Sequence, residues 1–337
     1  MHEAFYYNAL AIGLKGNHGK LAKLFEKHRS WKESWAATKD APDPEQSFAP
    51  VAKLGVRLIL KDDPEYPALL REIPFPPHGL YVLGDIAYAQ PAIAVVGTRA
   101  ATPHGKTLAK SFATALAGAG VPIISGLALG VDAEAHRGAL DVGGKTIAIL
   151  GTPLDYIYPR AHVRLADEIL KSGGAIVSEF AFGHGYNPSN FLVRNRIISG
   201  LSTGALIIEA PERSGSLATA RFALEQNRDI FVIPGSTQLT NYKGSHALIK
   251  SGAMLVTEPE DILEHYGLTE HQGASPEDLV TGDERDIVIA IRDAGGSATA
   301  DAIAEKTGKD ITEVNQALAL LSIKGIIKEL GQQYCIA

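Results

Sequence analysis

The segment Ala92-Ile-Ala-Val-Val-Gly-Thr-Arg-Ala-Ala-Thr-Pro-His-Gly105 gives the clearest indication of the fold, because an apolar run breaks at Gly97 into a short polar loop. The run over 92–96 is continuous rather than alternating, as in a parallel strand that helices cover on both faces. After Pro103, apolar residues recur at helical spacing until a second apolar run begins at Val121. We therefore expect a strand, a loop and a helix that leads to a parallel neighbouring strand.

The loop between this strand and helix is expected at the carboxyl edge of the sheet, where open α/β sheets bind their ligands. It carries Thr98, Arg99 and Thr102, which suits an anion site at a helix start. The motif lacks the three-glycine dinucleotide fingerprint. By itself it fits a structural turn with a solvent-facing arginine equally well.

The composition is that of an ordinary globular protein with two or three domains: 337 residues, 45% hydrophobic, 21% charged, and a net charge of −6. No apolar run approaches the roughly 18 residues that span a bilayer, and no signal-peptide pattern is seen, so we expect a cytoplasmic protein without a membrane partner. The single Cys335 excludes an internal disulfide and is expected in the core of a terminal strand. Because the net charge is negative, a nucleic acid would have to bind in a local basic pocket.

Both ends of the chain predict small domains. Helical patterns over 4–14, 18–29 and 31–38 predict an N-terminal helical domain over 1–45, which caps the next domain or assists DNA binding, and a linker is expected from Asp40 to Ser47. A second linker is expected over 267–282. The C-terminal domain, 283–337, has three helical patterns (286–293, 299–307 and 311–323) and two short strands, which together predict a winged helix. Its third helix carries few cations, so DNA-binding, protein-binding and structural roles all stay open.

Strand and helix patterns alternate through the central domain, 54–266. Residues 54–83 are expected to form an extension that leans on the sheet. The strands are expected near 92–97, 122–125, 145–150, 174–178, 203–209, 229–234 and 253–257. This alternation predicts an α/β fold with a doubly wound, mainly parallel sheet.

Three further segments offer ligand-binding groups. Ser125, Gly126 and Gly130 form a small-residue loop before Asp132, and His136 follows either as a site residue or as a core histidine. Arg194, Asn195 and Arg196 are expected at the end of a helix, where the guanidinium groups can bind phosphates; a surface salt-bridge cluster is the alternative. Ser214-Gly-Ser216 begins another helix and predicts a phosphate cradle, to which Thr219 adds a hydroxyl. Glu209 either organises the arginines or is structural.

The chain lacks the marks of several enzyme classes. The histidines are scattered, no cysteine cluster exists, and neither a Gly-X-Ser-X-Gly elbow nor a Walker-type Gly-Lys-Ser/Thr is present. We therefore expect no catalytic residue, no metal and no cofactor.

Taken in order, these motifs resemble the DNA-processing protein A family, DprA, also called Smf. The resemblance covers roughly residues 54–262 and rests on Gly97-Thr-Arg99, Thr102, Gly105, Ser125-Gly-Leu-Ala, Gly130-Val-Asp132, His136, Arg194-Asn-Arg-Ile-Ile-Ser-Gly-Leu-Ser202, Glu209-Ala210, Ser214-Gly-Ser-Leu-Ala-Thr-Ala220 and Pro234-Gly235. It implies an extended Rossmann-like fold with an N-terminal SAM-like helical domain and a C-terminal winged helix. It also implies a non-enzymatic dimer that binds single-stranded DNA, protects incoming DNA in natural transformation and loads the RecA recombinase.

By position, the resemblance assigns DNA binding to residues of all these loops. They are Gly97, Arg99, Ser125, Gly126, Arg194, Asn195, Arg196, Ser199, Ser214, Gly215, Ser216 and Thr219. The chain departs from the family pattern at His246, where an asparagine is expected, and at the apolar pair Leu192-Val193. Both departures concern the far rim of the expected pocket.

An enzyme is the alternative function. Ser214-Gly-Ser followed by Glu225 weakly resembles the nucleoside-monophosphate phosphoribohydrolases, although their doubled-glycine signature is missing at Pro234-Gly-Ser236.

Apolar residues near the last strand are expected to form a two-fold interface. They are Leu248, Ile249, Leu255, Val256, Ile262 and Leu263.

Overall fold

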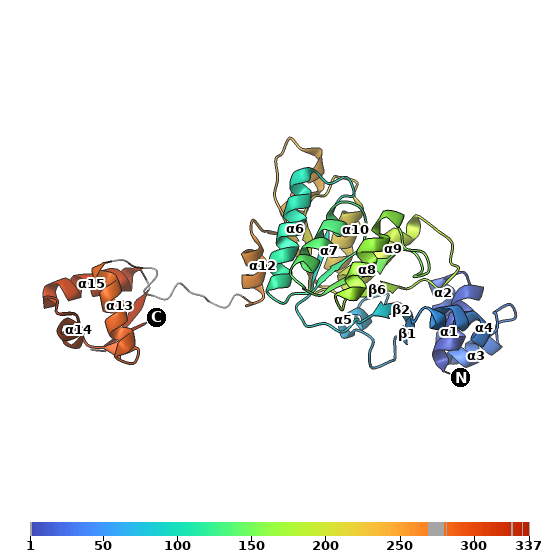
Figure 1. Cartoon of the computed structure of the whole chain (residues 1–337), viewed down its shortest axis with the longest axis horizontal. Coiled ribbons are helices and arrows are strands. Elements are labelled where there is room, and N and C mark those ends of the chain that lie inside the picture. Colours follow the sequence, from blue (N-terminus) through green and yellow to red (C-terminus); the bar gives the residue numbers. More distant parts are fainter. Residues whose placement is uncertain (1, 269–279, 281, 325, 332, 337) are drawn as a thin grey trace. The chain divides into compact units, whose positions relative to one another are not determined.

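The computed structural model describes residues 2–268, 280, 282–324, 326–331 and 333–336. The chain forms two compact units, Met1–Tyr266 and Gly267–Ala337. The first unit contains both the N-terminal helices and the large sheet (Figure 1). The finer boundaries expected at residues 45 and 54 stay predictions.

The N-terminal helices are α1 (Glu3–Gly13), α2 (His18–His28), α3 (Trp31–Ala36) and α4 (Pro44–Lys53). The first three were predicted, but the linker expected from Asp40 to Ser47 is wrong because α4 begins there. The Asp43 carboxylate accepts a hydrogen bond from the Gln46 amide at 2.9 Å, and Pro44 occupies the first helical turn. Asp-Pro is a turn signal, but it also makes a good N-cap and N1 pair, and sequence alone does not separate the two.

The first unit is built on a nine-stranded sheet with the order β1-β2-β6-β5-β4-β3-β7-β8-β9. The strands are β1 (Arg57–Leu60), β2 (Gly79–Gly84), β3 (Ile93–Val96), β4 (Ile123–Ser125), β5 (Thr146–Leu150), β6 (Ala175–Ser178), β7 (Gly204–Ile207), β8 (Asp229–Val232) and β9 (Met254–Leu255). Strands β3 to β9 pair in parallel, whereas β1 and β2 add an antiparallel edge. The predicted mainly parallel sheet is therefore confirmed, and the expected extension over 54–83 joins it.

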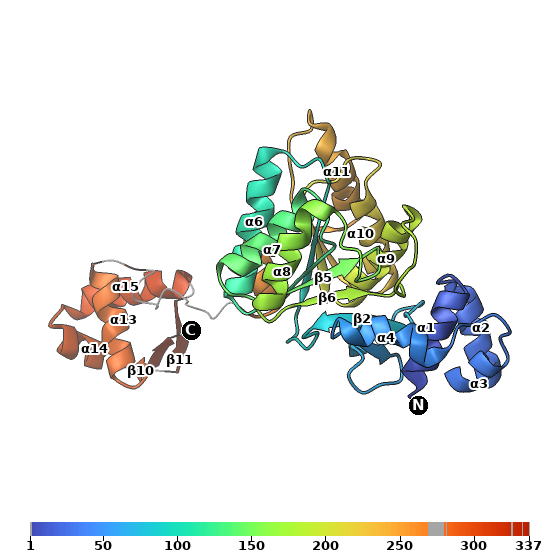
Figure 2. The ribbon, with the colours of Figure 1, turned by 45° about the vertical axis from the view of Figure 1, so that its right-hand side comes forward.

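Helices cover both faces of the sheet (Figure 2). They are α5 (Ala68–Arg71), α6 (Pro103–Gly118), α7 (Val131–Asp141), α8 (Val163–Lys171), α9 (Ser189–Gly200), α10 (Gly215–Glu225), α11 (Lys243–Lys250) and α12 (Pro259–His265). Side chains of β5 alternate between two cores: Ile147 and Ile149 pack in the core that contains residues of α9 and α10, and Ala148 and Leu150 pack with α8 and the N-terminal helices. Burial on both faces explains why the apolar runs are continuous.

The strand order reverses beside β3, which pairs with both β4 and β7. From β3 the chain proceeds to β4, β5 and β6 on one side, and from β7 it proceeds to β8 and β9 on the other. The loops that follow β3 and β7 therefore run in opposite directions and leave a crevice at the carboxyl ends of these strands.

The second unit is a winged helix, as predicted. Its elements are α13 (Asp283–Asp293), β10 (Ser297–Ala298), α14 (Ala300–Thr307), α15 (Ile311–Ile323), β11 (Ile327–Leu330) and β12 (Gln333–Ile336). The linker expected over 267–282 lies mostly outside the described residues. Cys335 lies on β12, the central strand of the three-stranded sheet, but is only half-buried. Successive strand residues face opposite sides, and Tyr334 is the one that packs against the core, so the predicted core position of Cys335 is wrong.

The apolar residues expected at a two-fold interface are largely used inside the first unit. Val256, Ile262 and Leu263 are buried in the monomer, whereas Leu255 is 48% exposed. Ile262 and Leu263 are buried because α12 packs on the sheet, where the rings of His265 and Tyr266 lie edge-on against Phe231. Leu248 and Ile249 are partly buried, and the two-fold interface expected at this end of the sheet stays a prediction.

In the described part of the chain, no helix has the length and apolar character that crossing a bilayer requires.

Candidate functional site

A cavity of about 310 Å³ lies in the crevice at the carboxyl ends of β3, β4 and β7. The loops after these strands and the first half of α9 form its walls. It is lined by Val96, Gly97, Thr98, Arg99, Ala128, Asp132, Pro188, Phe191, Leu192, Arg194, Asn195, Ile198, Pro211, Arg213, Ser214, Gly215, Ser216 and Thr219.

The start of α10 supplies hydrogen-bond donors to this cavity. Ser214 caps the helix: its Oγ accepts a bond from the Ser216 amide at 3.2 Å and lies 2.7 Å from the Ser216 Oγ. Gly215 between them is exposed, and no atom lies within 4 Å of the position that a Cβ would take. The first amides of a helix have no partner within the helix and carry partial positive charge, so this turn can bind an anion such as a phosphate.

Three arginines and one aspartate give the cavity lining a net positive charge. Arg99 and Arg213 are exposed on the loops after β3 and β7, whereas Arg194 is buried. The Arg99 guanidinium lies 5.2 Å from the centre of the Phe191 ring, which is cation–π geometry. The cavity can therefore attract a negatively charged ligand through its local positive charge, although the net charge of the whole chain is negative.

Arg194 lies at the floor of the cavity, and its guanidinium group is already hydrogen-bonded to the protein. Its guanidinium donates to the Gly126 carbonyl at 2.8 Å and to the Ile149 carbonyl, and its Nε donates to the Asn195 Oδ1 at 3.2 Å. Burial lowers the pKa of Arg194 to about 10, although Asp132 opposes the shift, so the side chain stays charged at neutral pH. Arg194 therefore contributes a fixed positive charge held by the backbone.

Asp132 and Gly126 shape this floor. The Asp132 carboxylate accepts a bond from the Gly126 amide at 3.1 Å, and burial raises its pKa despite the nearby charge of Arg194. A Cβ at Gly126 would lie 2.7 Å from both the Asp132 Oδ2 and an Arg194 nitrogen. Gly126 is needed because the two charged groups approach the backbone so closely.

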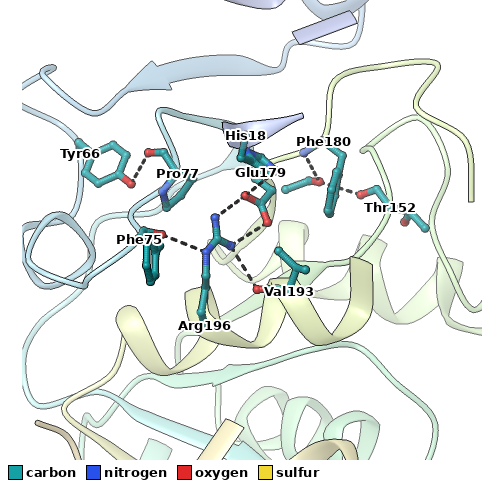
Figure 3. A network of polar contacts seen from close by, with 10 residues as sticks. His18, Tyr66, Phe75, Pro77, Thr152, Glu179, Phe180, Val193 and Arg196 are labelled. Atoms are coloured by element: carbon teal, nitrogen blue, oxygen red, sulfur yellow. Dashed lines mark hydrogen bonds and ion pairs between the residues drawn. The ribbon is translucent and has the colours of Figure 1, made fainter. Parts of the chain in front are cut away.

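Arg196 lies outside the cavity, contrary to the prediction that the Arg-Asn-Arg triplet forms one site. Consecutive helical residues are rotated by about 100°, so residues two apart point to nearly opposite sides. Arg196 donates two hydrogen bonds to Glu179, at 2.8 and 2.6 Å, and one to the Phe75 carbonyl at 3.0 Å (Figure 3). The triplet also lies within α9 rather than at its end.

Glu179 is a buried carboxylate that the sequence did not indicate as the partner of Arg196. It is buried and bonded to Arg196 on one side, and His18 of α2 lies 3.2 Å away on the other (Figure 3). Burial raises the pKa of Glu179, but the charges of Arg196 and His18 outweigh this effect and hold the pKa below its usual range. This network ties the N-terminal helices to α9.

Two predicted serines also lie outside the cavity. The Ser125 Oγ donates to the Val95 carbonyl at 2.7 Å and joins β4 to β3. The Ser199 Oγ contacts the carbonyls of Asn195 and Arg196 in its own helix, both at 3.3 Å. Both side chains are fully buried and satisfied by the backbone, so they are structural.

The remaining predicted residues gather at the cavity. They are Gly97, Arg99, Arg194, Asn195, Ser214, Gly215, Ser216 and Thr219, and Gly126 borders an adjoining hollow. Sequence reasoning missed Arg213 and Phe191. Arg213 could have been found, because it directly precedes the cap of α10 on a loop expected to bind phosphate, whereas the role of Phe191 depends on its contact with Arg99.

Glu209 is structural. Its buried carboxylate accepts bonds from the Thr102 amide and hydroxyl, at 3.0 and 2.5 Å, and from Asn241 at 2.9 Å. These contacts hold the loop that carries Arg99 and the start of α6. His246, the departure from the family pattern, bonds the Gly235 carbonyl at 3.0 Å and is not among the lining residues, whereas Leu192 lines the rim.

Of the two interpretations of His136, a site residue or a core histidine, the structure supports the core histidine. It is fully buried, its Nδ1 lies 2.7 Å from the Thr146 hydroxyl, and burial lowers its pKa to about 3. Because the folded pKa lies below the ordinary value of 6.5, the unfolded chain takes up the proton first as the pH falls.

We expect the free energy of unfolding to decrease as the pH is lowered from 6.5. The protonation of His136 in the unfolded chain is expected to account for up to about 1.4 kcal/mol of this decrease per pH unit. Urea denaturation at pH 7 and pH 5 measures this loss, and His136→Gln, which stays neutral, is expected to lose less. Equal losses in the parent and His136→Gln would exclude His136 as a source of the acid sensitivity.

The structure gives little support to the enzymatic alternative. Glu225 lies at the far end of α10 from Ser214 and is ion-paired with Arg221 at 3.8 Å, outside the cavity lining. Among the residues that the structure describes, no group of three or more potential metal ligands occurs.

Comparisons with known proteins agree with the fold. A family model described as DNA recombination-mediator protein A matches residues 57–267. The chain is similar to Protein Smf of Escherichia coli (strain K12), with 43% identity over 285 residues that cover 82% of this chain and 76% of that protein.

Two solved structures are similar to this one. The structure of DNA processing protein A (DprA) from Streptococcus pneumoniae matches with a TM-score of 0.67 and 33% identity, covering 78% of this chain and 98% of that chain. A structure of DNA processing protein A from Helicobacter pylori, described for its single-stranded DNA binding mode, matches with a TM-score of 0.57 and 30% identity, covering 63% and 97%.

Proposed function

The chain belongs to the DNA recombination-mediator protein A family, and we propose that it binds single-stranded DNA in the cavity beside β3 and β7. The observation that carries the proposal is that the N-terminus of α10 meets three arginines at the point where the strand order reverses. The name of the Helicobacter pylori relative, which refers to a single-stranded DNA binding mode, supports the same ligand.

In this proposal each group has a distinct role. The start of α10, with Ser214, Gly215 and Ser216, holds one phosphate. The exposed guanidinium groups of Arg99 and Arg213 bind neighbouring phosphates, and Arg194 supplies fixed charge below them. Gly97, Gly126, Asn195 and Thr219 shape the remaining walls.

A single strand fits this cavity better than a duplex. About 310 Å³ admits a phosphate and parts of one nucleotide, which a flexible strand can insert and a paired duplex cannot. The contacts are to the backbone of the nucleic acid, so binding is expected to tolerate any sequence.

At the level of the cell, we propose that the protein acts without catalysis and without a cofactor, in the cytoplasm and as a homodimer. It protects incoming single strands in natural transformation and loads RecA recombinase onto them. Support comes from the family and from relatives named DNA processing protein.

We expect the protein to bind a labelled single-stranded oligonucleotide at least tenfold more tightly than the matching duplex, with little dependence on sequence. Fluorescence anisotropy across a salt series measures this, and each phosphate contact is expected to add about 0.7 to the slope of log affinity against log salt. Incubation with AMP in parallel tests the alternative. Equal affinity for both DNA forms, or release of ribose phosphate from AMP, would contradict the proposal.

A further inference from the structure

A cluster of aromatic side chains borders the cavity. The ring centres of Tyr158, Tyr186 and Phe191 lie 5.1, 5.4 and 5.7 Å apart, pair by pair. Phe191 is buried and Tyr158 is half-buried, but 51% of Tyr186 is exposed. The cluster therefore has a fixed inner part and an outer ring open to solvent.

The aromatic cluster is continuous with the cavity. An adjoining hollow is lined by Tyr158 and Phe191 and shares Arg99, Ala128 and Phe191 with the cavity. The guanidinium groups of Arg99 and Arg194 lie near the Phe191 ring, at 5.2 and 5.9 Å from its centre. A strand whose phosphate lay near Arg99 would therefore pass beside the Phe191 ring, to which Tyr158 and the more exposed Tyr186 are adjacent.

We propose that Tyr158, Tyr186 and Phe191 form a stacking subsite for a base of the bound single strand. The inference rests on the proposed function, which places the phosphates at α10 and the arginines. An exposed ring backed by two other rings is rigid, and every base offers it a flat apolar face, so stacking adds affinity without sequence preference. Stacking is also insensitive to salt, unlike the phosphate contacts.

The experiment compares the full chain on oligothymidylate and on an abasic strand of the same length and charge, by fluorescence anisotropy at fixed salt. The parent is expected to prefer the strand with bases by about tenfold. Tyr186→Ala is expected to lose most of this preference while its affinity for the abasic strand stays unchanged. Tyr186→Phe, which keeps the ring, is expected to behave like the parent.

Phe75→Ala is the matched control, because Phe75 is an exposed aromatic residue, at 77%, outside the cavity lining. The subsite is overturned if the parent does not distinguish the two strands, or if Tyr186→Ala keeps the preference as Phe75→Ala does. In either case binding to both strands leaves the proposed function standing. Failure of the parent to bind any strand overturns both.

Discussion

Replacing Arg196 with alanine is expected to lower the free energy of unfolding by about 3–5 kcal/mol, because it leaves a buried carboxylate without its counter-charge. The Glu179 side chain is fully buried, and Arg196 donates to both of its oxygens. The Phe75 carbonyl would lose its donor as well. Urea denaturation, followed by circular dichroism, measures the loss.

Two comparisons show whether the cost comes from the unpaired charge. Arg196→Ala combined with Glu179→Gln removes both charges and is expected to be more stable than Arg196→Ala alone. Arg221→Ala removes an exposed arginine from an ion pair with Glu225 and is expected to cost less than about 1 kcal/mol. If Arg196→Ala were as stable as Arg221→Ala, the Arg196–Glu179 pair would not hold the fold together.

This expectation changes how the Arg-Asn-Arg triplet is tested. Because Arg196 is bonded away from the cavity, its substitution is expected to affect DNA binding only through the folded fraction. Arg194 is tied to two carbonyls below the cavity, so Arg194→Ala is expected to reduce stability and affinity together. Neither variant isolates a DNA contact.

Local features of the fold could be predicted from the sequence because each depends on neighbours in the chain. Apolar runs followed by glycine mark the parallel strands, and Ser214-Gly-Ser216 after β7 marks the N-terminus of a helix. Once the order of strands is set, the loops after β3 and β7 must meet at one edge of the sheet. The cavity and most of its residues follow from these two facts.

The direction of each arginine could not be predicted, because α9 is buried on nearly all sides. A helix with one polar face reveals its orientation, but α9 has buried residues from Asn190 through Gly200 on several faces. Which arginine faces the cavity is decided by Glu179 and His18, which come from different parts of the chain. Such tertiary pairing leaves no mark in the local pattern.

Replacing both Arg99 and Arg213 with alanine is expected to weaken single-stranded DNA binding by a hundredfold or more, since each loses a charge-assisted bond of about 1.5–3 kcal/mol. Each single substitution should also reduce the slope of log affinity against log salt by about 0.7. Both side chains are exposed, so their removal leaves the fold intact, which circular dichroism can verify.

Replacement by lysine is expected to have different effects at Arg99 and Arg213. Arg99 also lies over the Phe191 ring, and a lysine keeps the charge but not the planar stacking group. Arg99→Lys should therefore restore the salt slope without the full affinity, whereas Arg213→Lys should restore more of both. Arg221→Ala is the matched control, because Arg221 is an exposed arginine of α10 that does not line the cavity. If the double alanine variant binds the strand as tightly as Arg221→Ala at every salt concentration, DNA does not bind in this cavity.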